Sequence, residues 1–187
     1  MRKSAVLVCC VVIFSSAFAV AGDPPERFRG WIASVGGPRV PTDRTWVRLH
    51  ADTYTDDETV VRLANVLADK GQDALVEAMK ELEPAGWIAI GSNTRLDVRV
   101  IRSLGTGDAR VIRFITDRPI QFAEMWNATR SRNYKFGFVE LTLDADGEGE
   151  GTIIPAAEIA IEDGRVVITS LGIQPFRILQ VRPEKIK

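Results

Sequence analysis

The spacing of apolar residues separates the chain into an apolar beginning, a helical block and a long remainder dominated by strands. Strand patterns occupy residues 27–35 and 45–54, ahead of the helical block. After a short apolar stretch at 87–90, further strands are predicted at 96–104, 109–116, 135–143, 149–161, 165–169 and 175–181. The strand at 149–161 is expected to break at Pro155, because proline cannot donate a ladder hydrogen bond.

Helical spacing predicts two consecutive helices between the second strand and the short apolar stretch. Thr55 to Glu58 fits a capping box, in which the Thr55 side chain accepts from the Glu58 amide and Glu58 reaches back. Apolar residues then recur at helical spacing as far as Gly71, which is a typical C-terminal stop. A second helix is predicted over residues 72–83.

Turn residues between the later strands favour hairpins. Asp146-Gly147 and Asp163-Gly164 are typical of tight turns. Sequential hairpins indicate antiparallel pairing, because parallel strands would need crossover connections. The sequence therefore predicts an α+β fold, a curved antiparallel sheet or partly open barrel of about eight strands, with the two-helix block packed over one face or mouth. A further short helix is predicted over 119–130.

The first 21 residues have the pattern of an export signal. Arg2 and Lys3 precede an uncharged, mostly aliphatic stretch, and small residues allow cleavage after Ala19 or Ala21. We therefore expect a signal peptide at 1–21 and a single globular domain at 22–187, with no membrane span after cleavage. This predicts an exported protein, either periplasmic or secreted. An uncleaved anchor is the alternative.

Removing this leader changes the charge and the cysteine content. The 24 basic residues become 22 against 25 acidic ones, so the net charge changes from −1 to −3. A strongly basic nucleic-acid binder is excluded on this composition, and no nucleic-acid partner is expected. Both cysteines, Cys9 and Cys10, lie in the leader, which leaves the mature chain without a disulfide or a thiol ligand. No cofactor and no metal site are predicted.

His50 is the single histidine, and it is the first candidate for catalytic chemistry. On the strand at 45–54, His50 and Asp52 share one face, so that Asp52 can orient the imidazole as a general base requires. A solvated strand face with a local ion pair explains the same residues. No Gly-x-Ser-x-Gly nucleophile motif accompanies them.

The acidic segment from Asp144 to Glu150 has some features of a calcium loop. Counted from Asp144, position 6 is Gly149, as an EF-hand requires, but position 12 is Pro155 instead of a carboxylate. A hairpin tip explains these residues by turn chemistry alone. Weak surface binding of calcium remains as the alternative.

Arginine is concentrated between residues 95 and 135, where nine basic residues face four acidic ones. Guanidinium groups pair with carboxylates and phosphates through two parallel hydrogen bonds, so converging arginines would suit an anionic ligand. Cross-strand pairing with Asp97, Asp117 and Glu140 is the alternative. The predicted ligand-binding residues are Arg99, Arg102, Arg113, Arg118 and Arg130.

The tryptophans Trp31, Trp46, Trp87 and Trp126 allow two interpretations. Three lie near predicted strand starts and one lies on a predicted helical stripe, as core aromatic residues do. We therefore expect core packing, and a stacking surface for sugars or an apolar ligand is the alternative.

Three segments, Thr116–Ile120, Thr129–Ser131 and Val139–Asp144, follow the signal peptide in this chain. Together with that signal peptide they resemble a group of small exported bacterial proteins of unknown function, mainly between residues 116 and 155. This resemblance implies a bacterial, exported protein and implies no activity.

Three hypotheses for function follow from these observations. The first is an exported, non-enzymatic domain that binds a small anionic or apolar ligand, or an envelope protein. The second is a hydrolase that uses His50 with Asp52, or two of the carboxylates Asp52, Asp117, Glu124 and Glu140. The third is a protein-interaction module of the envelope. The absence of a phosphate loop or a nucleophile–base pair in the sequence favours the first, and the oligomeric state stays open.

Overall fold

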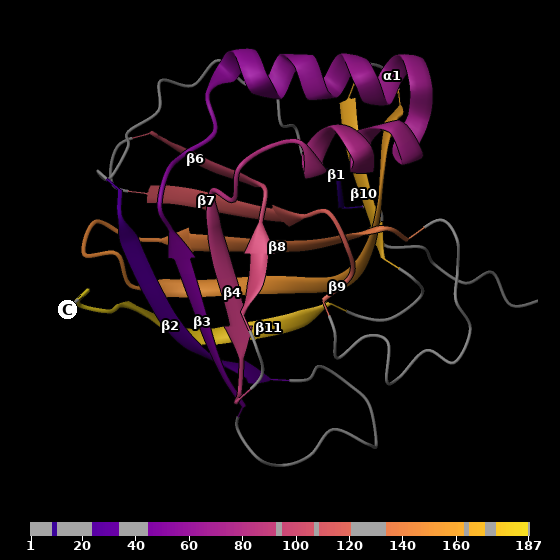
Figure 1. Cartoon of the computed structure of the whole chain (residues 1–187). Coiled ribbons are helices and arrows are strands. Elements are labelled where there is room, and N and C mark those ends of the chain that lie inside the picture. Colours follow the sequence, from indigo (N-terminus) through magenta and orange to yellow (C-terminus); the bar gives the residue numbers. More distant parts are fainter. Residues whose placement is uncertain are drawn as a thin grey trace, which may run out of the picture.

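The computed structural model describes residues 9–10, 24–33, 45–92, 95–106, 109–120, 134–162, 165–170 and 175–186. This part of the chain forms one helix and an eleven-stranded sheet (Figure 1). The helix is α1 (Asp57–Lys80). The strands are β1 (Cys9–Cys10), β2 (Glu26–Ala33), β3 (Thr45–Ala51), β4 (Gly86–Ile90), β5 (Leu96–Val98), β6 (Val100–Thr106), β7 (Ala109–Thr116), β8 (Phe136–Leu143), β9 (Gly149–Glu162), β10 (Arg165–Ser170) and β11 (Phe176–Pro183).

The sheet curls into a nearly closed antiparallel barrel. Its main strand order is β5-β4-β3-β2-β11-β9-β8-β7-β6, and every pair in it is antiparallel. The two ends of this order, β5 and β6, are consecutive in the chain and are separated only by Arg99. In Figure 1 the purple strands β2 and β3 cross in front of the orange strands β8 and β9, as opposite walls of a barrel do.

The prediction of a curved antiparallel sheet or partly open barrel is therefore confirmed for the antiparallel, curved sheet, although the barrel is nearly closed and the strand count of about eight is too low. The predicted strand at 96–104 divides at Arg99 into β5, which pairs with β4, and β6, which pairs with β7. This division lets one stretch of chain join both ends of the sheet. In addition, β1 pairs with β10, and its two cysteines lie in the segment expected to be the leader.

A single apolar core fills the inside of the barrel. Alternate residues of the strands point inward, as their period of two requires. On β3, for example, Val47, Leu49 and Ala51 are completely buried, whereas Trp46 and Arg48 are exposed. Phe28, Phe114, Leu141 and Ile178 contribute further large, fully or almost fully buried side chains. Packing of this kind stabilises the barrel without a disulfide.

The helical block is one bent helix instead of the two predicted helices. The chain continues from Asp57 to Lys80, and only Gly71 has a non-helical conformation, with φ 77°. Glycine adopts this conformation without a steric penalty, so the chain turns at Gly71 and resumes the helix at once. The predicted stop at this glycine is thus a bend, and Figure 1 shows the two limbs of α1 on either side of it.

The N-terminal cap of α1 also differs from the predicted capping box. Asp56 is the cap, because its carboxylate accepts a hydrogen bond from the Thr59 amide at 2.7 Å. The Thr55 hydroxyl instead accepts from the Ile101 amide of β6 at 3.0 Å. Thr55 therefore fastens the start of the helix to the barrel wall.

A second apolar core lies between α1 and the outer face of the barrel. Leu63, Leu67, Leu75 and Met79 of α1 pack there against strand residues such as Val100, Ile115, Phe138, Ile159 and Val166. The strands β6 to β9 are therefore covered on both faces where α1 lies over them. The predicted packing of the helical block over one face of the sheet is confirmed.

Strand β9 carries part of this second core beyond the barrel. It is continuous across Pro155, and the predicted break is instead an irregularity in its pairing with β8, between Phe136 and Phe138. The Pro155 carbonyl accepts a hydrogen bond from the Ile120 amide at 2.8 Å, so a segment outside the ladder satisfies it. Beyond Pro155, β9 pairs with β10 and presents Ile159 to the helix. The rest of the predicted helix at 119–130 lies outside the described residues.

No helix of the described residues combines the length and the apolar character that crossing a membrane requires.

The Asp56 cap predicts a pH-dependent loss of stability in Asp56→Ala. Hydrogen bonds from Thr59 lower the pKa of the Asp56 carboxyl below its usual value, so the charged cap favours the folded state. This contribution is present above about pH 4, the pKa in the unfolded chain, and is lost as the pH falls through the lower pKa of the folded state. Asp56→Ala should therefore lower the thermal midpoint at pH 7 and have a smaller effect at acidic pH.

Glu58→Ala is the matched control, because Glu58 is the other acid that the predicted capping box requires. We expect Asp56→Ala to lower the thermal midpoint more than Glu58→Ala does, because Asp56 is the cap. If Thr55 and Glu58 formed the capping box, Glu58→Ala would instead have the larger effect. Thermal unfolding of the three proteins, followed by circular dichroism, decides between these arrangements.

Candidate functional site: an apolar pocket with an arginine rim

The outer face of the barrel changes from apolar to polar at the edge of α1. Beneath the helix this face presents Val100 of β6 and Ile115 of β7. Arg102 follows Val100 by two residues, and Arg113 precedes Ile115 by two, so both arginines lie on this same face. They are directly opposite each other across the ladder. Arg113 in turn lies opposite Glu140 of β8. An apolar surface therefore borders a pair of adjacent arginines.

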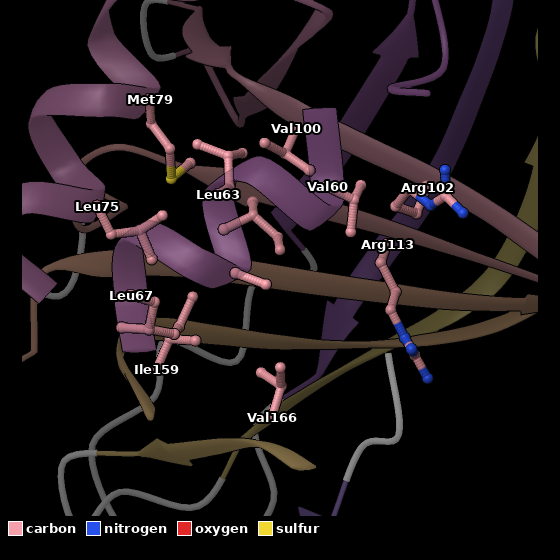
Figure 2. A pocket seen from close by; sticks show the side chains of 12 residues that line it. Val60, Leu63, Leu67, Leu75, Met79, Val100, Arg102, Arg113, Ile159 and Val166 are labelled. Carbon is pink, nitrogen blue, oxygen red and sulfur yellow. The ribbon is translucent and has the colours of Figure 1, made fainter. Parts of the chain in front are cut away.

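A pocket of about 60 Å³ lies where these two surfaces meet. Among the described residues its lining surface is entirely apolar, because Arg102 and Arg113 contribute only the aliphatic parts of their side chains. The lining comes from both limbs of α1 and from four strands. Figure 2 shows Arg102 and Arg113 at the end of the pocket near Val60, with their guanidinium groups directed away from Leu67 and Met79. The lining residues are Val60, Leu63, Ala64, Leu67, Leu75, Met79, Val100, Arg102, Arg113, Ile115, Ile159 and Val166.

Arg102 is held rigidly at the rim by the start of α1. Its Nη1 donates to the Thr55 carbonyl at 2.7 Å, and its Nη2 donates to the Asp57 carboxylate. Its Nε is buried and has no hydrogen-bond partner among the described residues. The guanidinium group therefore keeps one unused donor, which is costly unless a ligand or water satisfies it.

Arg113 is the second cation of the rim. Its Nε donates to the Glu140 Oε2 at 2.7 Å. The side chains of Arg102 and Arg113 are only 17% and 12% exposed, whereas Asp57, the acid paired with Arg102, is 87% exposed. Like charges directly opposite each other in a ladder repel, and here they are mostly shielded from water. Asp57 and Glu140 offset part of this repulsion, and an anion placed between the two guanidinium groups would offset more of it.

The other three predicted ligand-binding arginines do not line this pocket. Arg99 donates from Nε to Asp117 at 3.2 Å and from Nη1 to the Leu82 carbonyl at 2.8 Å, so it ties the β5–β6 corner to the chain after α1. Arg118 is exposed, and its carbonyl accepts a hydrogen bond from the Thr116 hydroxyl. Arg130 lies outside the described residues. The predicted cross-strand pairing of arginines with Asp117 and Glu140 is confirmed.

His50 and Asp52 are in contact on the outer face of β3, as their spacing predicts. The His50 Nε2 lies 2.9 Å from the Asp52 Oδ1, and the ring packs beside Trp87, with 5.3 Å between ring centroids. The side chain is buried instead of solvated, because His50 is only 6% exposed. Its Nδ1 is also buried and has no partner among the described residues. This placement gives a substrate little access to the imidazole.

The predicted catalytic carboxylates have separate partners. Asp52 contacts His50, Asp117 contacts Arg99, and Glu140 contacts Arg113. Glu124 lies outside the described residues. Within the described ranges, no three histidine, cysteine or acidic side chains gather as metal ligands would.

The acidic segment at Asp144 is a hairpin tip, as turn chemistry predicts. The Asp144 Oδ1 accepts hydrogen bonds from the amides of Asp146 and Glu148 at 3.0 and 2.9 Å. Gly147 has φ 76°, which closes the turn between β8 and β9. The carboxylate of Asp144 is therefore occupied in shaping the turn.

The prediction that the tryptophans pack in the core is wrong for Trp46. Trp31 and Trp46 lie opposite each other on the outer face of β2 and β3, with their rings in contact. Trp46 is 42% exposed. Trp87 is buried, but on the outer face, where the guanidinium carbon of Arg95 lies 4.2 Å from its ring centroid. Trp126 lies outside the described residues.

One polar cluster was not indicated by the sequence pattern, because its members are far apart in the chain. Arg110 of β7 donates from both Nη atoms to Glu26 of β2, at 3.1 and 2.9 Å. The Tyr54 hydroxyl donates to the same carboxylate. Burial, together with Glu26, raises the pKa of Tyr54 far above its usual value. The cluster connects strands that are not neighbours in the sheet.

No family model, no curated protein and no solved structure matches this chain.

The raised pKa of Tyr54 predicts a specific loss of stability in alkali. In the unfolded chain a tyrosine has a pKa of about 10. Because the pKa of Tyr54 is higher in the folded state, the free energy of unfolding is unaffected below that pH and falls as the pH rises above it. Tyr54→Phe removes this titration. Between pH 8 and about pH 10.5, the free energy of unfolding measured in urea should therefore fall less in the variant than in the wild type. An equal loss in both proteins would mean that Tyr54 does not titrate abnormally.

Proposed function

We propose that this protein binds a small amphiphilic anion, a carboxylate with a short apolar tail, in the pocket beneath α1. The observation that carries the proposal is the position of Arg102 and Arg113 at the rim of an otherwise apolar pocket. The tail lies among the side chains of α1 and the strands, and the carboxylate lies at the two guanidinium groups. The proposal unites the anionic and the apolar ligand that the sequence favours.

The volume of the pocket limits the size of the tail. A single buried water occupies roughly 10–15 Å³ on such a measure, and a cavity of about 150 Å³ accommodates benzene. A pocket of about 60 Å³ therefore suits a tail of a few carbon atoms, linear or branched. Longer tails require the limbs of α1 to move away from the sheet, and the bend at Gly71 is the natural place for such a movement.

The chemistry of the lining supports binding without a reaction. Among the described residues, the polar side chains that border it are the two arginines, whose guanidinium groups are hydrogen-bond donors without an acceptor. In the part of the chain that the structure describes, no general base, nucleophile or carboxylate lines it. His50 and Asp52 lie on β3 and its end, outside this lining. A non-enzymatic binding protein is the function that these observations support best, and its export remains a prediction from the leader pattern.

Removing one arginine should weaken binding of the anion. Charge-assisted hydrogen bonds contribute about 1.5–3 kcal/mol, so Arg102→Gln or Arg113→Gln should lower the affinity for isovalerate or hexanoate roughly 10- to 100-fold. Isothermal titration calorimetry measures this change. Arg177→Gln is the matched control, because Arg177 pairs with Glu150 on the outer face and does not line the pocket. Equal affinities in all variants would refute the role of the rim.

Filling the pocket should abolish binding while the arginines remain. Ala64 lines the pocket from the first limb of α1, and Ala64→Leu places extra apolar volume inside it. We expect unchanged or higher thermal stability and no calorimetric signal with isovalerate. Val61→Leu is the control, since Val61 is exposed on the same helix and does not line the pocket. Retained binding in Ala64→Leu would place the ligand elsewhere.

A further inference from the structure

A different part of the outer surface carries an unusual row of arginines. Arg182 of β11 lies opposite Arg29 of β2, and Arg29 lies opposite Arg48 of β3. Residues opposite each other share one face of a sheet, and neighbouring strands are about 4.8 Å apart. We call Arg182, Arg29 and Arg48 the arginine row. It places three positive charges side by side on three consecutive strands.

A local distortion of β11 brings Arg182 into this row. Between Leu179 and Arg182 the pairing with β2 shifts by one residue, because Leu179 opposes Trp31 and Arg182 opposes Arg29. Gln180 has φ 52°, a conformation that non-glycine residues rarely adopt. Such bulges redirect the side chains that follow them. Regular alternation would instead direct Arg182 and Leu179 to opposite faces.

The positive charge of the row is largely uncompensated. Among the described residues, no carboxylate lies within 4.0 Å of Arg29 or Arg48. Arg182 has one distant partner, Glu148, at 3.8 Å, and both side chains are more than half exposed. Exposed pairs of this kind contribute little energy, so they do not explain why three arginines are adjacent. A protein with an overall negative charge thus concentrates positive charge on this face.

Trp46 extends the same face with an exposed aromatic ring. It lies two residues from Arg48 on β3, and successive same-face residues of a strand follow this spacing. The guanidinium carbon of Arg29 lies 5.8 Å from the centroid of the Trp46 ring. The face therefore combines a flat apolar ring, 42% exposed, with a line of cations.

We propose that the arginine row and Trp46 bind an acidic polysaccharide. The apolar face of a sugar ring stacks on Trp46, and carboxylate or similar acidic groups along the polymer pair with the row, because guanidinium groups form bidentate contacts with such groups. The extended row suits a polymer with repeated charges better than a single small anion. This site is independent of the pocket beneath α1, and its ligand differs from the one proposed there.

Two other polyanions fit the face less well. Insertion into an anionic membrane uses several exposed apolar side chains, yet Trp46 is accompanied among the large exposed hydrophobic residues only by Val61 and Ile186 in the described part of the chain. Val61 lies on α1 and Ile186 follows β11, so neither extends this face. Single-stranded nucleic acid uses a succession of stacking rings, one for each of several bases. This face offers one well-exposed ring.

Affinity electrophoresis in gels that contain polygalacturonate tests the proposal directly. We expect the wild-type protein to be retarded by polygalacturonate and not by neutral dextran, and we expect the retardation to weaken as salt is added. The double variant Arg29→Gln with Arg48→Gln should lose affinity roughly tenfold or more, and Trp46→Ala should also lose it. Arg62→Gln, on the exposed surface of α1, is the matched control and should behave as the wild type.

Further arms of the experiment separate the alternatives. Arg29→Lys with Arg48→Lys keeps the charge and should retain part of the binding, and circular dichroism confirms that each variant is folded. Equal retardation by dextran, an unchanged affinity in the double glutamine variant, or no effect of Trp46→Ala would each overturn the proposal. Tighter binding of an oligo(dT) strand or of phosphatidylglycerol vesicles than of polygalacturonate would replace it with a nucleic-acid or membrane site.

Discussion

The packing of α1 on the outer wall of the barrel is the contact on which the rest of the structure depends. A curled sheet fills its own interior with one set of alternating residues, and here that interior is occupied by large apolar side chains. The other set would expose Val100, Ile115 and Phe138 to water if α1 did not cover them. The helix therefore creates a second core, and the pocket lies within it. The pocket, where we propose that a ligand binds, lies outside the barrel because the inside is full.

The same packing explains why the charged rim is rigid. Arg102 bonds to the backbone and to the first turn of α1, so it is fixed by the element that forms the roof of the pocket. Arg113 is fixed from the other side by Glu140 of the neighbouring strand. Both side chains would therefore lose little further conformational freedom on binding the proposed anion, and such preorganisation increases affinity.

Much of this arrangement follows from local sequence patterns. The alternation at 45–51 predicts which residues of β3 face the interior. The strands predicted at 96–104 and 109–116 pair with each other as β6 and β7. The register in which Thr106 opposes Ala109 also places Arg102 opposite Arg113, so turn chemistry could have identified this pair among the five predicted arginines. Charge density alone does not separate it from Arg99, which forms part of a corner.

Other features depend on tertiary contacts that local patterns do not contain. The bulge at Gln180 turns the side chain of Arg182 to the opposite face of β11. The register of β11 shifts there against both of its neighbours, β2 and β9. Trp46 is large and aromatic, which is typical of a core residue, yet its position on β3 directs it to the outer face of the barrel. The Thr55 hydroxyl accepts a hydrogen bond from the amide of Ile101 on β6, 46 residues further along the chain. Asp56 therefore caps the helix in its place.

Nuclear magnetic resonance of the complex with isovalerate tests the central claim most directly, because it locates the ligand in the folded protein. Intermolecular contacts should connect the methyl groups of isovalerate to those of Leu63, Leu67 and Ile159, which line the pocket. Contacts with Val47 or Leu49 inside the barrel, or none at saturating ligand, would contradict it.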